Sequence, residues 1–594
     1  MSRLNKYHIL SAFAENHGRK TVNECEDFLL RQDFALPKQA EKIPRVSTRG
    51  ASFILIFFIG LVLRFWKLSS TPVSLSMNEV AIAYSSFSIA ETGKDEWGNF
   101  LPLAFRSVGD YKAPVLIYLM IPAIKLFGLN EFSVRFTVAL FGLLTLPVVY
   151  ALVWLLTKNK KTALITMFSL AISPWHLQYS RTTSEAVLAL FFMLLGVTVF
   201  LWSVGSKGRI LWLSVIFFVV SMYSYHAERI FVPLLVLSLF FIYFRLIKKI
   251  FHENPRVLLK SVIIGLLIVG PLVKIILTDQ GQIRARSVFF TNDENIVYQL
   301  NPKGKKQTFP NSIFDSNFAM LANFWSKRYL NYFDFSFLFY KGSQFTVPGV
   351  ADVGLLHLVE LPFFVFGCWL VFFKKKIDTS SKLLIGTWFL IGPVVSSFTN
   401  NEQQPLRSLV WLPMPQILFG IGLTEILEKL QAFRFWLRNV FYLGFLTLLI
   451  ASLGYFLDIY MIHSPIFFSE YWDYGMKEAS LYAWEHQKDY KQILFDPTFG
   501  SIGPYTESIP HLHILFYGKY PPSLYQNDPH HSKNSVNFSN FVFDPINWRT
   551  DEFKENILLI GSPWSLPLKD INPAKVKKII HFKNGSIGFI ITET

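Results

Sequence analysis

The chain has 594 residues, of which 52% are hydrophobic and only 16% are charged, and its mean hydropathy of +0.34 lies outside the range of soluble globular proteins. The net charge of +16 is carried by short basic clusters between apolar runs. This distribution is typical of cytoplasmic loops that face anionic lipid, and it argues against nucleic acid as a partner. The two cysteines, Cys25 and Cys368, exclude a disulfide framework and a cysteine metal site.

Runs of about twenty apolar residues, the length that crosses a bilayer as a helix, recur along the chain. They predict an all-α polytopic membrane bundle of about eleven transmembrane helices, near residues 50–67, 132–156, 162–179, 184–204, 210–225, 230–247, 260–277, 354–373, 383–398, 408–427 and 440–461. The apolar stretch 114–128 is short and contains Pro122, so we expect an interfacial or re-entrant helix there. If it were a further span, every later loop would change sides.

The basic clusters predict the orientation of the bundle. They lie in loops that share one side of the membrane under the eleven-span count, at residues 158–161, 207–209, 248–256, 374–376 and 429–438. Because positive loops stay inside, we expect a cytoplasmic N-terminal tail, residues 1–49, and a C-terminus outside the cell membrane. Three polar segments then lie outside. Two are loops of the transmembrane domain 50–464, at about 68–131 and 279–352, and the third is the C-terminal domain 465–594. Chemistry or recognition is therefore expected at the outer face.

The first outer loop holds an unusual density of acidic residues, namely Glu79, Glu91, Asp95, Glu96 and Asp110. A helical pattern begins at Asn78 and Glu79, and its apolar positions fall on one face. This pattern predicts an amphipathic helix along the membrane surface. Any single acid among the five also fits a solvated helix without further function.

Several charged residues are predicted to lie at the outer ends of spans. Arg181 and Glu185, in SRTTSEA, are four residues apart and are expected to share a helix face. The others are Tyr225, His226, Glu228 and Arg229 in SYHAERIF, Arg284 and Arg286 in GQIRARS, and Arg407 in NNEQQPLRS. Each charge taken singly fits a salt bridge between helices. Taken together, arginines that converge on one face indicate an anionic ligand, because the guanidinium fork suits phosphate.

The sequence contains no P-loop, no H-E-x-x-H and no G-x-S-x-G motif. It also contains no cytoplasmic nucleotide-binding domain, which excludes a primary ATP-driven transporter. No ligand cluster demands a metal, so we expect no cofactor, although a divalent metal could assist catalysis.

The first loop contains TGKDEWG, LPLAFRSVGDYK and NEFSVRF, and later outer ends contain SPWHLQYSRTTSEA, YSYHAERIFVP and GQIRARSVF. With these motifs, residues 50–460 resemble the integral-membrane glycosyltransferases of the C superfold, in particular the dolichyl-phosphate-mannose-protein mannosyltransferase family and its bacterial aminoarabinose-transferring members. The resemblance implies transfer of a sugar from a polyprenyl-phosphate donor in the bilayer to an acceptor on the outer face. It also implies a first-loop acid that acts as general base on the acceptor hydroxyl.

The chain departs from this family at one position. The family's loop typically begins with Asp-Glu, whereas this chain has Asn78 and Glu79, and an amide accepts no proton at neutral pH. Three alternatives follow: Glu79 takes the role, another acid such as Asp110 or Asp95 serves, or the chain is a catalytically silent relative. We favour retained activity, because the arginines that face the donor phosphate otherwise match the family.

The leaving lipid phosphate develops negative charge that needs cationic stabilisation. Arg284 and Arg286 are the first choice for this role, with support from four further residues, Arg181, His226, Arg229 and Arg407. The donor already carries an activated bond, so the reaction needs no nucleotide.

The C-terminal segment predicts a small α/β domain. KEASLYAWEHQKD is expected to form a helix, YKQILFDPT and ENILLIGSP to form strands, and KKIIHFKNGSIGFIIT to form two strands joined at Asn584-Gly585. The domain either grips the acceptor or serves as a lid or spacer. The competing functions for the whole chain are a polytopic lipid or sugar transporter, against which the absence of an internal repeat argues, and a non-catalytic scaffold.

Overall fold

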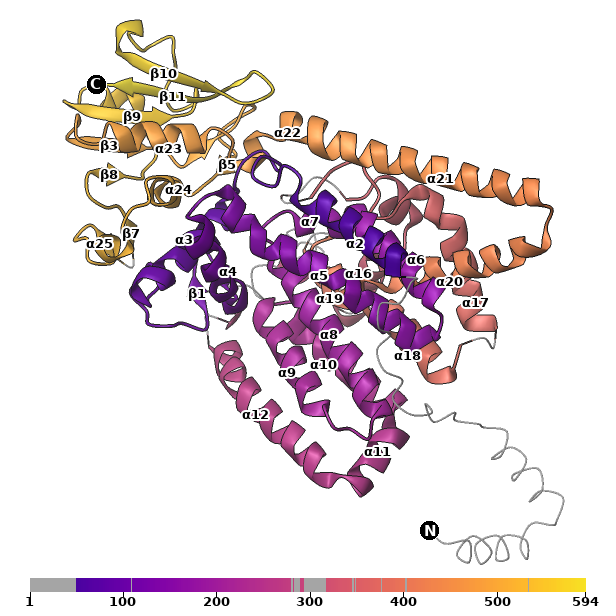
Figure 1. The fold of residues 1–594 in the computed structure, drawn as a ribbon. Helices are drawn as coiled ribbons and strands as arrows, with labels where there is room; N and C mark the ends of the chain where they lie inside the picture. Colours follow the sequence, from indigo (N-terminus) through magenta and orange to yellow (C-terminus); the bar gives the residue numbers. More distant parts are fainter. Residues whose placement is uncertain are drawn as a thin grey trace, which may run out of the picture.

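The computed structural model describes residues 50–594 except 108, 279–280, 283–288, 293–316, 344–346, 348, 375–376, 401–402 and 533. The predicted tail 1–49 and the two arginines Arg284 and Arg286 lie outside the described residues. Within the described residues, a large bundle of helices is followed by a smaller domain that contains a sheet (Figure 1).

Each of the predicted apolar runs contains a helix. These helices are α2 (Gly50–Phe65), α5 (Glu131–Thr157), α6 (Lys160–Ile172), α8 (Glu185–Gly205), α9 (Leu211–Ser224), α10 (Glu228–Ile242), α12 (Pro255–Leu277), α17 (Leu361–Phe373), α18 (Thr379–Ile391), α20 (Met414–Lys429) and α21 (Phe435–Asp458). Among the described residues, five helical segments are long and apolar enough to cross a membrane, or six if α10 and α11 (Phe244–Glu253), bent by 77°, form one span. The chain is therefore a multi-pass membrane protein. The count of eleven spans and the orientation stay predictions.

Two predicted helices differ from simple straight spans. The run 162–179 is broken, because α6 ends at Ile172 and Pro174 begins the separate short helix α7 (Pro174–Ser180); proline is well suited to a first helical position, where no N–H is needed. The stretch after residue 113 forms α4 (Pro114–Phe127), which contains Pro122 and packs against α5. Its fourteen residues extend over about 21 Å, and it is one of several apolar helices shorter than the bilayer core of about 30 Å. Whether this helix crosses the membrane stays a prediction.

The helix predicted in the first loop is α3 (Met77–Thr92), but its surroundings differ from the prediction. Ser76 and Glu79 form a capping box at its start, and Gly93, with φ of +70°, ends it. Instead of lying on the membrane surface with one face in solvent, α3 is buried on most sides. It is covered by α4 and by two helices of the C-terminal domain, α24 (Pro510–Tyr517) and α25 (Pro522–Gln526).

The C-terminal domain confirms the predicted helix and strands. Helix α23 (Met476–Glu485) precedes a five-stranded sheet whose spatial order is β10 (Val576–His581), β11 (Ile587–Glu593), β9 (Ile557–Gly561), β3 (Gln492–Phe495) and β8 (Phe541–Val542). Strand β3 runs parallel to β8 and β9, whereas β11 is antiparallel to β9 and β10. The β10–β11 turn contains Gly585 at φ of +88°, a conformation that favours glycine. The exact domain limits stay a prediction.

The C-terminal domain is joined to the first loop by polar contacts. The Tyr84 hydroxyl donates to the Tyr520 carbonyl at 3.0 Å, and the Gln526 side-chain amide donates to the Asp95 carbonyl at 2.8 Å. Asp473 Oδ2 accepts a hydrogen bond of 2.7 Å from the Met77 amide at the start of α3. The domain therefore fixes the helix that carries Asn78 and Glu79.

Candidate functional site

A buried lysine of the first loop forms the centre of a polar cluster between this loop and the ends of bundle helices. Strands β1 (Phe105–Arg106) and β2 (Tyr111–Lys112) form a short hairpin that places Lys112 next to the start of α3. Lys112 Nζ donates to Asn78 Oδ1 at 2.7 Å and lies 3.3 Å from Asp110 Oδ1. Burial lowers the pKa of Lys112, and the nearby Glu185 carboxylate opposes that shift. The cluster thus holds an ammonium, an amide and a carboxylate within contact distance.

A second carboxylate reaches the cluster from the bundle. Glu185 begins α8 and accepts a hydrogen bond of 3.1 Å from the Ala113 amide, directly after Lys112. It interacts electrostatically with Lys112 and with Arg229. A carboxylate in the first turn of a helix is favoured by the helix dipole, so the local fold stabilises Glu185 at this position.

The turn after α9 and the first turn of α10 supply three polar side chains. His226 Nε2 donates to the Tyr111 carbonyl at 3.0 Å, and burial together with Arg229 lowers the pKa of His226 to about 3. His226 is therefore neutral and positions strand β2, whereas Arg229 contributes positive charge. Burial raises the pKa of Tyr225 to about 12, so this side chain remains a phenol.

Arg407, which precedes the short helix η4 (Leu409–Trp411), completes the cluster. It interacts with the Tyr225 hydroxyl both electrostatically and by a hydrogen bond. Its Nη1 atom is buried and makes no hydrogen bond to any described residue. A buried donor without an acceptor is costly, so this atom is suited to an anionic ligand that enters the cluster.

Glu79, the neighbour of Asn78, lies outside this cluster on another side of α3. Its side chain is 3% exposed. Oε1 accepts from Arg135 Nε at 3.1 Å and from the Thr183 amide at 3.0 Å, and Oε2 accepts from Arg135 Nη2 at 3.2 Å and from the Ser76 amide at 3.1 Å. With this many donors around a buried carboxylate, the contacts favour a structural role over that of the predicted general base.

The alternative base Asp95 is also engaged by its own loop. It is fully buried, and its Oδ1 atom accepts from the Trp97 amide at 3.0 Å and from the Asn99 amide at 2.8 Å. These bonds shape the turn that follows α3, as expected for an aspartate in a tight turn.

The guanidinium of Arg181 is also buried and donates to backbone carbonyls. Its Nη1 donates to the Leu63 carbonyl at 2.8 Å and its Nη2 to the Thr71 carbonyl at 3.1 Å, so it holds the chain that leaves α2. The predicted pairing with Glu185 on one helix face is wrong, because Arg181 caps the end of α7 whereas Glu185 begins α8.

The structure thus sorts the predicted site residues into groups. It brings together Asn78, Asp110, His226, Arg229 and Arg407, it separates Glu79 and Arg181 from them, and Arg284 and Arg286 lie outside the described residues. The sequence analysis did not predict Lys112 as a site residue. A signal was present, because the motif GDYK places this lysine two residues after Asp110. Among the described residues, no group of three or more His, Cys, Asp or Glu side chains is arranged to hold a metal ion. Independence from metal stays a prediction.

Comparisons with known proteins concern the family and the fold of the chain. Residues 54–269 match the model of the dolichyl-phosphate-mannose-protein mannosyltransferase family. An uncharacterized protein from Aquifex aeolicus (strain VF5) is 29% identical over 168 residues, which cover 28% of this chain and 32% of that relative. The crystal structure of ArnT from Cupriavidus metallidurans in the apo state is similar with a TM-score of 0.51 at 13% identity, over 92% of this chain and 98% of that chain. The resemblance predicted from the sequence is therefore confirmed: the chain has the fold of the C-superfold membrane glycosyltransferases, and its residues 54–269 match the mannosyltransferase family.

Proposed function

We propose that the chain is a membrane glycosyltransferase that moves a sugar from a polyprenyl-phosphate donor to a hydroxyl acceptor on the outer face of the membrane. The observation that carries this proposal is the cluster around Lys112, whose ammonium lies beside the Asp110 and Glu185 carboxylates. At its edge Arg407 contacts Tyr225 and keeps a buried Nη1 without a described acceptor. The family matched by residues 54–269 is described by its phosphate-linked sugar donor. The fold shared with ArnT is a second, independent support.

The cations of the cluster suit the leaving group. When the bond between the sugar and the phosphate breaks, its electron pair stays on the phosphate, whose charge increases. Lys112, Arg229 and Arg407 provide positive charge in a site sheltered from water, where such charge is most effective. His226, which is neutral, keeps Lys112 in place through the Tyr111 carbonyl.

Asp110 is our candidate for the general base. Asn78 accepts a hydrogen bond from Lys112, as its amide oxygen can, but it takes no proton. Asp110 reaches the same ammonium from the β1–β2 hairpin, so a carboxylate is present beside Lys112 although position 78 lacks one. In this proposal Asp110 takes the proton of the acceptor hydroxyl, the acceptor oxygen bonds to the anomeric carbon, and the lipid phosphate leaves.

The alternative of a catalytically silent relative is favoured by one observation, the amide at Asn78. It differs from the enzyme proposal in one measurable respect. A silent relative releases no polyprenyl phosphate from any donor, and Asn78→Asp would then be the change that introduces turnover.

The experiment measures free polyprenyl phosphate released by purified full-length protein from polyprenyl-phosphate sugar donors. Lys112→Ala should lower the rate about ten- to a hundredfold, because a charge-assisted contact to an anion contributes about 1.5–3 kcal/mol. Lys477→Ala is the matched control, since Lys477 forms an ion pair with Glu131 away from the cluster. Equal rates for Lys112→Ala and the control would refute the site.

A further inference from the structure

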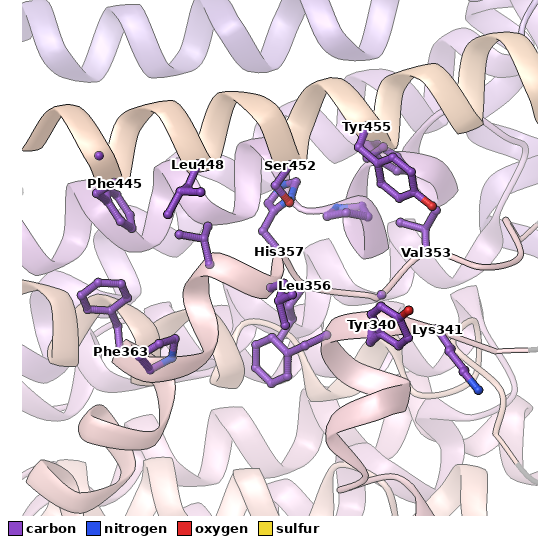
Figure 2. A pocket seen from close by; sticks show the side chains of 18 of the residues that line it. Tyr340, Lys341, Val353, Leu356, His357, Phe363, Phe445, Leu448, Ser452 and Tyr455 are labelled. Carbon is purple, nitrogen blue, oxygen red and sulfur yellow. The ribbon is translucent and has the colours of Figure 1, made fainter.

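A large apolar cavity separates α21 from the rest of the bundle. It has a volume of about 880 Å³ and is lined by α21, by the start of α17, by η3 (Leu358–Glu360), by parts of the segment 339–359 and by Pro174. Figure 2 shows Phe445, Leu448 and Ser452 of α21 on one side and Phe363 and Leu356 on the other. None of the residues of the Lys112 cluster lines it.

Helix α21 contacts the bundle at separate points along this cavity. Near its middle, Phe445 packs edge-on against Phe363 with ring centroids 5.3 Å apart. Near its end, Phe456 packs into a small cluster with Leu177 of α7. Between these contacts, the His357 ring and Ser452 Oγ are joined by one hydrogen bond of 2.9 Å. The cavity is therefore a consequence of how α21 is held.

The cavity has one polar end and one apolar end. Along α21 its lining runs from Val440 to Phe456, about 24 Å at about 1.5 Å per residue. The polar end carries Tyr340 and Tyr455, which are 64% and 56% exposed, and two exposed charges, which are Lys341 and Asp352. Tyrosine is enriched at membrane–water interfaces, so this end lies at the level of lipid head groups and the remainder at the depth of acyl chains.

The surroundings of α21 determine what can fill such a cavity. The helix exposes large apolar side chains, for example Leu443 at 66% and Ile450 at 61%, and in a multi-pass membrane protein such faces contact lipid. Water is not stable in an apolar cavity, and an empty one forgoes dispersion contacts along its whole lining. An acyl chain from the adjacent bilayer is apolar, unlike water, and it makes the dispersion contacts that an empty cavity lacks.

The two charges at the polar end indicate the kind of head group. The segments that carry them run side by side, since the Leu356 amide donates to the Leu338 carbonyl at 2.8 Å. A cation and an anion at one mouth complement the phosphate and the ammonium of a zwitterionic head group. We propose that this cavity binds an acyl chain of a bilayer phospholipid whose zwitterionic head lies at Lys341 and Asp352. The bound lipid would fill the gap under α21, the helix that leads into the C-terminal domain.

Two glycines of α21 allow a matched test. A Cβ atom added at Gly444, which lines the cavity, meets no atom within 4 Å, so Gly444→Trp can fill the cavity without a backbone clash. A Cβ at Gly454 also meets no atom within 4 Å, but Gly454 does not line the cavity. Native mass spectrometry of full-length protein in mild detergent measures the retained lipid. Wild type and Gly454→Trp should each retain one phospholipid, and Gly444→Trp should lower its occupancy at least tenfold.

Each other outcome contradicts the proposal. Equal phospholipid occupancy in Gly444→Trp and wild type, or no retained lipid in wild type, would overturn it. Retention of polyprenyl phosphate that Gly444→Trp displaces would assign the cavity to the donor's chain instead. Gly444→Leu, a smaller filler with an intermediate expected loss, serves if the tryptophan variant folds poorly.

The head group is tested by adding lipid back to delipidated protein. Phosphatidylethanolamine should restore occupancy at least fivefold better than phosphatidylglycerol, and equal binding of the two would refute the zwitterionic assignment. All these measurements record lipid binding, so they are independent of whether the protein transfers a sugar.

Discussion

Two charged regions join the first loop to the bundle, and they differ in how completely their side chains are engaged. In the first, Glu79 and Arg135 form a buried ion pair whose carboxylate also accepts backbone hydrogen bonds. In the second, Lys112 is shared between an amide and a carboxylate, and Arg407 nearby keeps a buried donor without a described acceptor. Asn78 and Glu79 are adjacent in sequence, yet they belong to different regions.

The comparison separates charges that stabilise the fold from charges that can act on a ligand. A buried ion pair is tolerable only when its remaining lone pairs and protons are satisfied. The Glu79 region meets that condition and therefore has little capacity left for a substrate. A binding site must instead retain donors and charge for the ligand, as the Lys112 cluster does.

The largest expected effect concerns the carboxylate of the second region. Asp110→Asn should lower the rate of polyprenyl phosphate release about a hundred- to ten-thousandfold, because loss of a general base has effects of that size. The amide keeps the shape of the side chain, so the folded protein should be recovered in normal yield. Asn78→Asp is the companion variant, and its rate should equal or exceed that of wild type. Full activity in Asp110→Asn would place the base elsewhere.

The second-largest expected effect is on the stability that the ion pair of Glu79 and Arg135 gives the fold. Glu79→Gln removes the charge that compensates the buried Arg135, and breaking such a pair typically costs about 3–5 kcal/mol. We expect a lower midpoint of thermal unfolding, with turnover per folded molecule preserved. If Glu79→Gln unfolded at the same temperature as wild type but had lost turnover, this assignment would be wrong. Glu79 would then be the general base, as its position next to Asn78 in the sequence suggested.

The sequence predicted the parts of the fold that depend on local patterns. Apolar runs located the helices, and Asn584-Gly585 located the β10–β11 turn. It did not predict which charges meet, because those contacts join residues far apart in the chain: Thr183 is 104 positions from Glu79, and Lys112 is 34 positions from Asn78. The break before Pro174 was also missed, since hydropathy alone does not distinguish one helix from two.

The smallest expected effect concerns the contact between the C-terminal domain and α3. Asp473 is 4% exposed and accepts the Met77 amide at 2.7 Å, which adds a second cap to a helix that Ser76 and Glu79 already cap. Asp473→Ala should therefore lower the free energy of unfolding by about 1 kcal/mol, the usual contribution of a cap. Because α3 carries Asn78, turnover should fall with it, by less than about tenfold. Lys477→Ala, in the same domain but at an ion pair whose lysine is 50% exposed, should change stability by less than about 0.5 kcal/mol. Equal stability of the two variants would show that the domain does not hold α3 through Asp473. The Glu79 region and the Lys112 cluster would then owe their different arrangements to the bundle and the first loop alone.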